Sequence, residues 1–228
     1  MTKGVFICIE GGDGSGKGTQ HQLLSDRLRK EGKQFITVDF PRYGEPSAEL
    51  VGLYLNNEFG DATKLDPRLA SLPFAIDRQA AKPEIEQALK NGKLVLANRF
   101  SASNMAHQGA KFAGHAERVA FFKWLHRLEH EIMGIPEPDY HFVLHVPAKI
   151  AQARVLQKAD RSYTTKKLDG HEADLGYQKR AEQTYVDLVA TFPERFGLVE
   201  CVEGEYQKTP AEIHEEIWNK VKELMHYE

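Results

Sequence analysis

The sequence has no apolar stretch approaching the roughly 20 residues that a membrane-spanning helix requires. Its cysteine content is low, and Cys8 and Cys201 each lie inside an apolar run, which predicts buried reduced thiols rather than a disulfide. Basic residues are not in excess, because 30 Lys and Arg accompany 33 Asp and Glu, so no nucleic-acid partner is expected. The N-terminus has no signal-peptide pattern, and these absences together predict a soluble cytoplasmic protein with no membrane contact.

Short apolar runs recur along the chain and predict a buried sheet. Hydrophobic residues make up 41% and charged residues 28% of the 228 residues, as in a globular protein with a sizeable core. The runs are nearly continuous in apolar character, which is typical of parallel strands that are covered on both faces. They span residues 5–9, 35–38, 94–97, 141–146 and 198–202.

Segments with helical periodicity separate these runs. They cover residues 17–31, 66–91, 115–133, 148–158, 174–191 and 210–226. Asp66 and Pro67 are typical of a helix start, and Pro83 predicts a kink or a split in the same helix. Strands that alternate with helices predict an α/β fold with a doubly wound, parallel, five-stranded sheet, and no linker or repeat divides residues 1–228, so a single domain is expected.

The first predicted strand runs directly into a glycine-rich loop. Residues 11–19 match the pattern G-x-x-x-x-G-K between a strand and a helix. The glycines allow backbone N–H groups to turn inward around phosphate oxygens at the helix N-terminus. Lys17 is expected to reach the β- and γ-phosphates of ATP and to act in catalysis. The predicted ATP-binding residues are Gly11, Gly12, Asp13, Gly14, Ser15, Gly16, Lys17, Gly18 and Thr19.

The residues after this lysine depart from the general pattern. Gly18 stands where Ser or Thr commonly follows the lysine, and Thr19 comes one position later. The sequence Gly-Lys-Gly-Thr-Gln resembles that of nucleoside monophosphate kinases. This resemblance implies a P-loop NTPase fold of the nucleoside monophosphate kinase type, with ATP and Mg²⁺ as cofactors. Thr19 is a candidate to act on the ion or on its waters.

Further motifs, in the same order along the chain, resemble the thymidylate kinase family, which makes dTDP from dTMP and ATP. Asp13 is the acid that this family carries in its phosphate loop, and the resemblance implies that it contacts the sugar 3′-hydroxyl. Phe40-Pro41-Arg42 resembles the family's Phe-Pro-x-Arg segment, shortened by one residue. The resemblance therefore implies that Arg42 binds the substrate phosphate.

Residues 72–78, Leu-Pro-Phe-Ala-Ile-Asp-Arg, resemble the family's Leu-Phe-x-Ala-x-Arg helix. Phe74 and Arg78 are four residues apart and so lie on one helical face. The resemblance implies that the Phe74 ring stacks on the pyrimidine while the Arg78 guanidinium donates to its carbonyl. Taken alone, Phe74 favours a role in core packing, and only together with Arg78 and the rest of the pattern does it favour base stacking.

The segment Asn98-Arg99-Phe100 stands where the family reads Asp-Arg-Tyr. The resemblance implies that Arg99 clamps the acceptor phosphate and is catalytic, a task for which bidentate guanidinium geometry is suited. Asn104 and Gln108, also four residues apart, are candidates to read the pyrimidine edge.

Asn98 replaces the acid that normally holds Mg²⁺ or its waters. An asparagine offers only a neutral carbonyl oxygen to a cation. Either Asn98 suffices, or Glu10 or Asp39 at a neighbouring strand end supplies the charge.

Basic residues gather after the fourth predicted strand and match the lid of phosphoryl-transfer kinases, placed at about residues 154–172. Gly14 stands at the loop position where one thymidylate kinase subtype carries an arginine. The resemblance implies that a cation of the lid supplies the charge of that arginine. Arg161 is the first candidate and Arg154 the second. The lid cations are Arg154, Lys158, Arg161, Lys166 and Lys167.

These observations predict a kinase with a mobile lid. It is expected to transfer the γ-phosphoryl of ATP to dTMP, giving dTDP for dTTP biosynthesis. Two alternatives stay open: a kinase for another (deoxy)nucleoside monophosphate such as dUMP, and a slow nucleotide-binding regulator, which the missing acid at Asn98 motivates. The family resemblance implies a homodimer, and the apolar helical face of residues 119–132 is expected to serve either the core or that interface.

Overall fold

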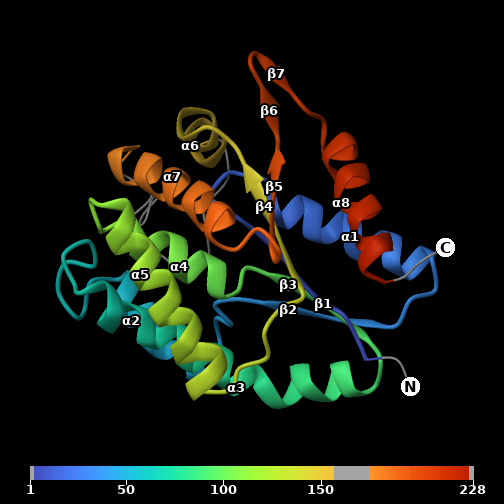
Figure 1. Ribbon diagram of the computed structural model, residues 1–228, viewed down its shortest axis with the longest axis horizontal. Helices are drawn as coiled ribbons and strands as arrows, with labels where there is room; N and C mark the ends of the chain where they lie inside the picture. Colours follow the sequence, from blue (N-terminus) through green and yellow to red (C-terminus); the bar gives the residue numbers. More distant parts are fainter. Residues whose placement is uncertain (1–2, 157–174, 226–228) are drawn as a thin grey trace.

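A five-stranded, fully parallel sheet forms the centre of the protein (Figure 1). The computed structural model describes residues 3–156 and 175–225. The strand order is β2-β3-β1-β4-β5, which confirms the predicted doubly wound arrangement. The strands are β1 (Phe6–Gly11), β2 (Phe35–Asp39), β3 (Leu94–Asn98), β4 (Tyr140–His145) and β5 (Phe196–Glu200).

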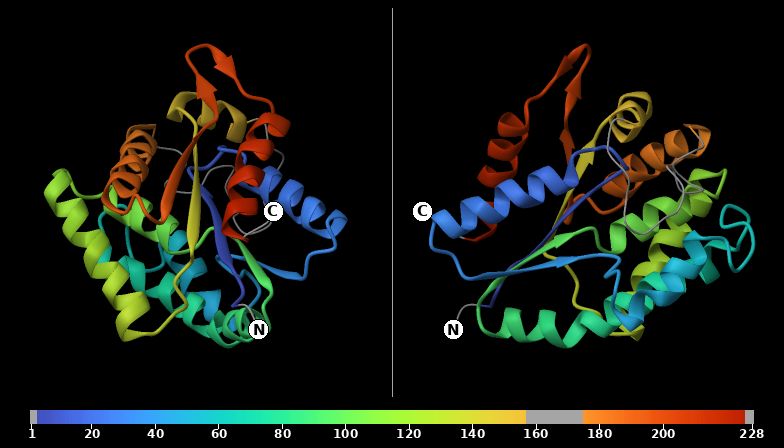
Figure 2. Two further views of the ribbon diagram at one scale, coloured as in Figure 1. Left: turned by 45° about the vertical axis from the view of Figure 1, so that its right-hand side comes forward. Right: turned by 180° about the vertical axis from the view of Figure 1, so that it is seen from behind.

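Helices cover both faces of the sheet, as the near-continuous apolar strands require (Figures 1 and 2). Along β1 the side chains alternate: Ile7 and Ile9 pack in one cluster, whereas Phe6 and Cys8 pack in another. The first cluster lies under α1 (Lys17–Lys30) and α8 (Pro210–Leu224). The other face is covered by α3 (Pro67–Lys90), α4 (Ser101–Gly109), α5 (His115–His126) and α7 (Leu175–Thr191).

Several smaller elements were not predicted from the sequence. They are a 3₁₀ turn (Pro46–Ala48), α2 (Glu49–Leu55) and a hairpin of β6 (Val202–Glu203) and β7 (Tyr206–Gln207). Helix α4 was also missed, although it carries two of the candidate site residues. Helix α6 (Ala148–Leu156) begins where predicted, and the rest of that predicted helix lies outside the described residues.

Helix α3 begins as predicted but does not divide in two. Asp66 caps it by accepting hydrogen bonds from Arg68 N and Leu69 N, and Pro67 occupies its first position. The helix continues through Pro83 to Lys90, so the expected split is not observed. Ala81 and Ile85 are buried on either side of the exposed Pro83, and their packing holds the helix together where one backbone hydrogen bond is missing.

The predicted helix over residues 115–133 has the right extent but changes character. It is α-helical to His126 and then a π-helix, η2 (Arg127–Ile132). Phe122 and Leu125 are buried, so this face serves the core, whereas Ile132 is 67% exposed. Across the described parts of the chain, no helix is both long and apolar enough to span a membrane.

Candidate active site

The glycine-rich loop joins β1 to α1 and has the backbone conformation of a phosphate cradle. Gly14 and Gly16 have positive φ angles of 79° and 96°, a region that favours glycine. The Lys17 ammonium donates to the Gly12 carbonyl at 2.7 Å and so lies across the loop. A β-carbon on Gly14 would come within 2.2 Å of the Ala151 carbonyl oxygen in α6, so any side chain there would displace that helix.

A cavity of about 480 Å³ opens beside this loop, at the carboxyl ends of β1, β2 and β3. The crevice at the carboxyl ends of parallel strands is where open α/β sheets bind ligands. Its wall combines the loop with side chains from α3, β3 and α4. The predicted site residues that line it are Asp13, Gly14, Gly16, Lys17, Gly18, Phe74, Arg78, Asn98, Arg99, Asn104 and Gln108.

Arg99 is held between the loop and α4. Its backbone has φ of 64°, which is uncommon outside glycine and points its side chain back toward the loop. The guanidinium contacts the Asp13 carboxylate, donates to Ser103 Oγ at 2.9 Å and lies 3.4 Å from the Gly11 carbonyl oxygen. Asp13 also lies 3.9 Å from the Lys17 ammonium. Two cations and one carboxylate therefore meet at the mouth of the cradle.

Glu10 forms the floor beneath this cluster and is fully buried. It accepts a hydrogen bond from Phe100 N at 2.7 Å and one from Ser103 Oγ at 2.6 Å. Burial alone would raise the pKa of Glu10, but His141, Ser103 and the Arg99 guanidinium favour the carboxylate, and the pKa is lowered. Glu10 thus fixes the turn that carries Arg99.

The far end of the cavity is lined by an aromatic ring and three buried polar side chains. Phe74 packs edge-to-face on Tyr54 with ring centroids 5.8 Å apart. Arg78 and Asn104 are both buried, and Gln108 contacts the Tyr54 hydroxyl. Tyr54 was missed at the sequence level, because α2 belongs to no predicted motif.

Comparison with known proteins agrees with this geometry. A sequence model described as thymidylate kinase matches residues 9–213. The chain belongs to the thymidylate kinase family. The thymidylate kinase of Mycobacterium tuberculosis is 34% identical over 187 residues, which cover 82% of this chain and 86% of that protein. That of Protochlamydia amoebophila is 32% identical over 222 residues, covering 95% of each chain.

The fold is shared beyond the bacterial relatives. A solved structure of thymidylate kinase from Candida albicans matches with a TM-score of 0.70, covering 99% of this chain and 94% of that one at 23% identity. Asn98, at the position where the family resemblance leads us to expect an acid, is the last residue of β3. Its Nδ2 donates to the Asp39 carboxylate of β2 at 2.9 Å, and both side chains line the cavity.

Two predicted arginines make contacts elsewhere. Arg42 does not line the cavity in the described part of the chain. Its backbone N–H and its side chain both donate to the Asp77 carboxylate of α3. Arg154, on α6, donates to Gln207 Oε1 of the hairpin at 2.9 Å.

Thr19 is exposed on the first turn of α1. Arg161 and lid residues 157–172 lie outside the described residues.

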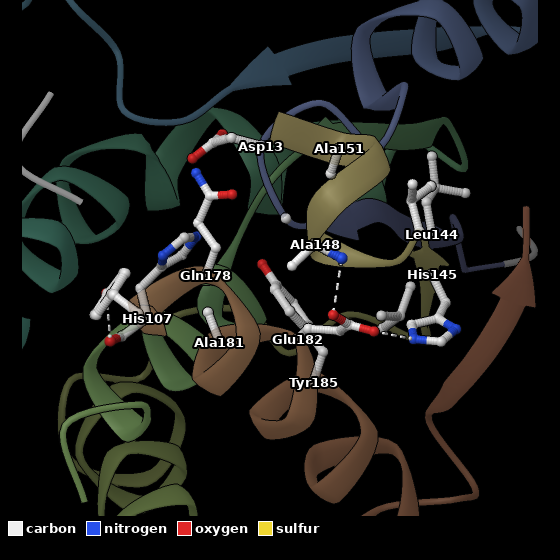
Figure 3. A pocket seen from close by; sticks show the side chains of 14 residues that line it. Asp13, His107, Leu144, His145, Ala148, Ala151, Gln178, Ala181, Glu182 and Tyr185 are labelled. Atoms are coloured by element: carbon white, nitrogen blue, oxygen red, sulfur yellow. Dashed lines mark hydrogen bonds and ion pairs between the residues drawn. The ribbon is translucent and has the colours of Figure 1, made fainter. Parts of the chain in front are cut away.

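A second, smaller cavity of about 40 Å³ lies between the loop, α6 and α7 (Figure 3). His145 at the end of β4 lies beside it and contacts Glu200 at 2.6 Å and Glu182 at 3.1 Å. Glu182 in turn accepts from the Ala148 N–H, which starts α6. These contacts give His145 a structural role in anchoring α6, consistent with its omission from the predicted site.

Proposed function

We propose that this protein binds ATP in the loop of residues 11–19 and transfers its γ-phosphoryl to dTMP, giving dTDP and ADP. The observation that carries this proposal is the continuous cavity from Lys17 to Arg78, with Arg99 between them. In this proposal Lys17 binds the donor phosphates, Arg99 binds the acceptor phosphate, and Arg78 contacts the pyrimidine base. Transfer then requires no covalent enzyme intermediate, and catalysis comes from positioning and charge stabilisation.

The donor and acceptor phosphates would meet at the paired cations of the cradle. Lys17 would leave the Gly12 carbonyl, which it contacts at 2.7 Å, to grip the β- and γ-phosphates. Arg99 would hold the acceptor phosphate through charge-assisted hydrogen bonds. Asp13, which faces both cations, keeps them in place and is available to accept from the sugar 3′-hydroxyl. Among the lid cations, Arg161 remains our candidate for the additional catalytic charge.

The base end suits a pyrimidine with a carbonyl next to a ring N–H. Phe74 offers a ring face for stacking, worth about 1–3 kcal/mol per base. Arg78 is a donor and Asn104 carries an amide oxygen, so the pair matches a carbonyl oxygen and the adjacent imide N–H. Gln108 lies at the same wall through its contact with Tyr54. Thymine and uracil both present this edge, so dUMP stays a possible second substrate.

Mg²⁺ is the expected companion of ATP, where it would neutralise charge on the β- and γ-phosphates. Within residues 3–156 and 175–225, no three or more His, Cys, Asp or Glu side chains are grouped to hold a metal ion. Mg²⁺ commonly takes only one or two carboxylates, with phosphates and water completing its shell. The Asp39 carboxylate beside Asn98 fits that requirement, whereas Glu10 is committed to Phe100 and Ser103.

We therefore propose that Asp39 supplies the acid that Asn98 lacks. Asp39→Asn is expected to raise the Mg²⁺ concentration for half-maximal activity about tenfold, because it removes the carboxylate next to the ion. It should also weaken Mn²⁺ binding to the ATP complex, measured by electron paramagnetic resonance. Exchanging the two residues, Asp39→Asn with Asn98→Asp, should recover most of the loss. Unchanged Mn²⁺ binding in Asp39→Asn would exclude this role.

The substrate is tested by following ADP release with Mg·ATP over a panel of nucleoside monophosphates. We expect strong acceleration by dTMP, because its imide edge and its phosphate match both ends of the cavity. Strong acceleration by AMP or dGMP with none by dTMP would overturn the proposed function. A slow rate with every acceptor would instead favour the nucleotide-binding regulator.

We further propose a cytoplasmic homodimer. Leu69, Leu72 and Ile76 recur at helical spacing on α3 and are 58%, 38% and 43% exposed, an apolar stripe that a second copy would cover. Both cysteines are buried and unpaired, which suits a reducing compartment. Sedimentation equilibrium should give twice the chain mass of 25.8 kDa; a monomer at micromolar concentration would contradict the dimer.

A further inference from the structure

The π-helix η2 brings a buried carboxylate to the base end of the cavity. Glu129 lies within Arg127–Ile132 and is fully buried. Its two oxygens accept from Arg78, with Oε2 2.7 Å from Nε and Oε1 2.5 Å from Nη2. Such wider helical turns are rare and are frequently found at functional sites. The turn therefore places Glu129 where it holds the guanidinium by a bidentate ion pair.

This ion pair fixes which part of Arg78 remains for a ligand. Nε and one Nη2 hydrogen are directed at Glu129, so the guanidinium plane cannot rotate without breaking both bonds. Nη1 makes a longer 3.5 Å contact with the Phe100 carbonyl oxygen. Arg78 is 2% exposed yet lines the cavity. Because an arginine has no acceptor atom, it can offer a base only N–H donors.

Glu129 also determines how Asn104 is turned. The Asn104 amide nitrogen donates to the Ser71 carbonyl at 3.1 Å and lies 3.3 Å from Glu129 Oε1. Both partners are acceptors, so a flipped amide would set its oxygen against two other oxygens. The Asn104 oxygen must therefore point away from them. In the described part of the chain this buried oxygen has no hydrogen-bond partner, although Asn104 lines the cavity.

We propose that Glu129 is a positioning residue that selects an oxo-imide pyrimidine over an amino pyrimidine. It fixes a donor at Arg78 beside an acceptor at Asn104, the complement of the carbonyl and N–H of thymine or uracil. Cytosine presents an amino donor and an unprotonated ring nitrogen and is mismatched at both positions. Buried polar groups left unpaired by a wrong substrate can support discrimination of about 10⁴–10⁵-fold. The inference rests on the proposed function, since it concerns how that site reads its base.

The test compares kcat/KM for dTMP, dUMP and dCMP in the full-length wild type and in Glu129→Gln. The variant keeps the size of the side chain but loses its charge and can flip its amide. We expect kcat/KM for dTMP and dUMP to fall together by at least about tenfold, with dCMP changed less than about threefold and the KM for ATP unchanged. The preference for dTMP over dCMP should therefore fall at least about tenfold. Glu129→Asp, which retains the carboxylate, should recover part of that preference.

A matched control separates this role from a loss of stability. Asp187→Asn breaks the ion pair between Asp187 of α7 and Arg118, whose side chains are also mostly buried, with N and O 2.6 Å apart. Its thermal midpoint should fall, while its preference for dTMP over dCMP stays at the wild-type value. An equal loss for all three substrates in Glu129→Gln would overturn the proposal and leave Glu129 a structural residue.

Two further outcomes are distinguishable. If Glu129→Gln does not fold, Glu129→Asp carries the test, because its shorter carboxylate must still lower kcat/KM for dTMP and dUMP more than for dCMP. A wild type without activity on dTMP would contradict the proposed function itself. A wild type active on dTMP, with its preference over dCMP unmoved by either Glu129 variant, would contradict only this inference.

Discussion

Replacing Lys17 with methionine is expected to lower kcat for phosphoryl transfer by about 10³-fold. The ammonium group lies at the N-terminus of α1, 2.7 Å from the Gly12 carbonyl oxygen. In the proposed function, this cation follows the γ-phosphoryl as charge develops on it. Methionine keeps the length and the apolar stem of the side chain, so the fold should be retained. Single-turnover kinetics at saturating Mg·ATP and dTMP measure the effect on the chemical step.

The matched control is Lys30→Met, in the last turn of the same helix. Lys30 is exposed and far along α1 from the loop, so its replacement should change kcat by less than about twofold. A loss below tenfold in Lys17→Met would mean that the loop backbone and other cations carry the donor phosphates. That result would remove Lys17 from the catalytic residues.

Replacing Arg99 with alanine is expected to lower kcat/KM for dTMP by about 10³-fold or more, since a catalytic arginine can contribute about 10³–10⁵ in rate. The guanidinium is held by Asp13 and by Ser103 Oγ at 2.9 Å, so it is already oriented toward the loop before substrate binds. Its loss removes the proposed clamp on the acceptor phosphate and one of the two cations that face Asp13. Steady-state kinetics with dTMP varied at saturating Mg·ATP give the value.

Arg99→Lys distinguishes charge from geometry at the same position. Lysine keeps the positive charge but cannot make a bidentate contact, and the two side chains are not interchangeable at such sites. We expect Arg99→Lys to recover less than about tenfold of the loss. Recovery to the wild-type rate would show that charge alone suffices. The KM for ATP should stay within about threefold in both variants, because the Lys17 cradle is intact.

Local sequence was sufficient for features that depend on neighbouring residues. The loop of residues 11–19 was recognised because its glycines must adopt conformations that other residues avoid, as Gly14 and Gly16 do. The five strands were recognised because burial on both faces leaves nearly continuous apolar runs. Helix α4 was missed because it is short, Ser101–Gly109, and because its buried residues include the polar Asn104 and Gln108, which a search for apolar periodicity does not count.

Pairings between distant segments could not be predicted. Arg78 and Glu129 are 51 residues apart, and the π-turn that buries Glu129 has no signature in the sequence. Arg42, which is predicted to bind the substrate phosphate, pairs in the structure with Asp77, 35 residues away, and nothing in the sequence indicated that contact. Long-range partners of this kind depend on how helices pack, since a side chain meets whichever charge the fold brings within about 4 Å.

The sequence by itself determined that this chain has a phosphate loop, a doubly wound parallel sheet and the motifs of a thymidylate kinase. The loop and the sheet follow from backbone conformation and from periodic burial, both of which are encoded locally, whereas the thymidylate kinase motifs were recognised by their resemblance to that family. The tertiary structure decided which charges act together: Asp39 beside Asn98, and Glu129 behind Arg78 and Asn104. Electrostatic contacts depend on distance in space, and only folding brings Asp39, Asn98, Arg78 and Asn104 to the wall of one cavity, with Glu129 bonded to Arg78 behind it.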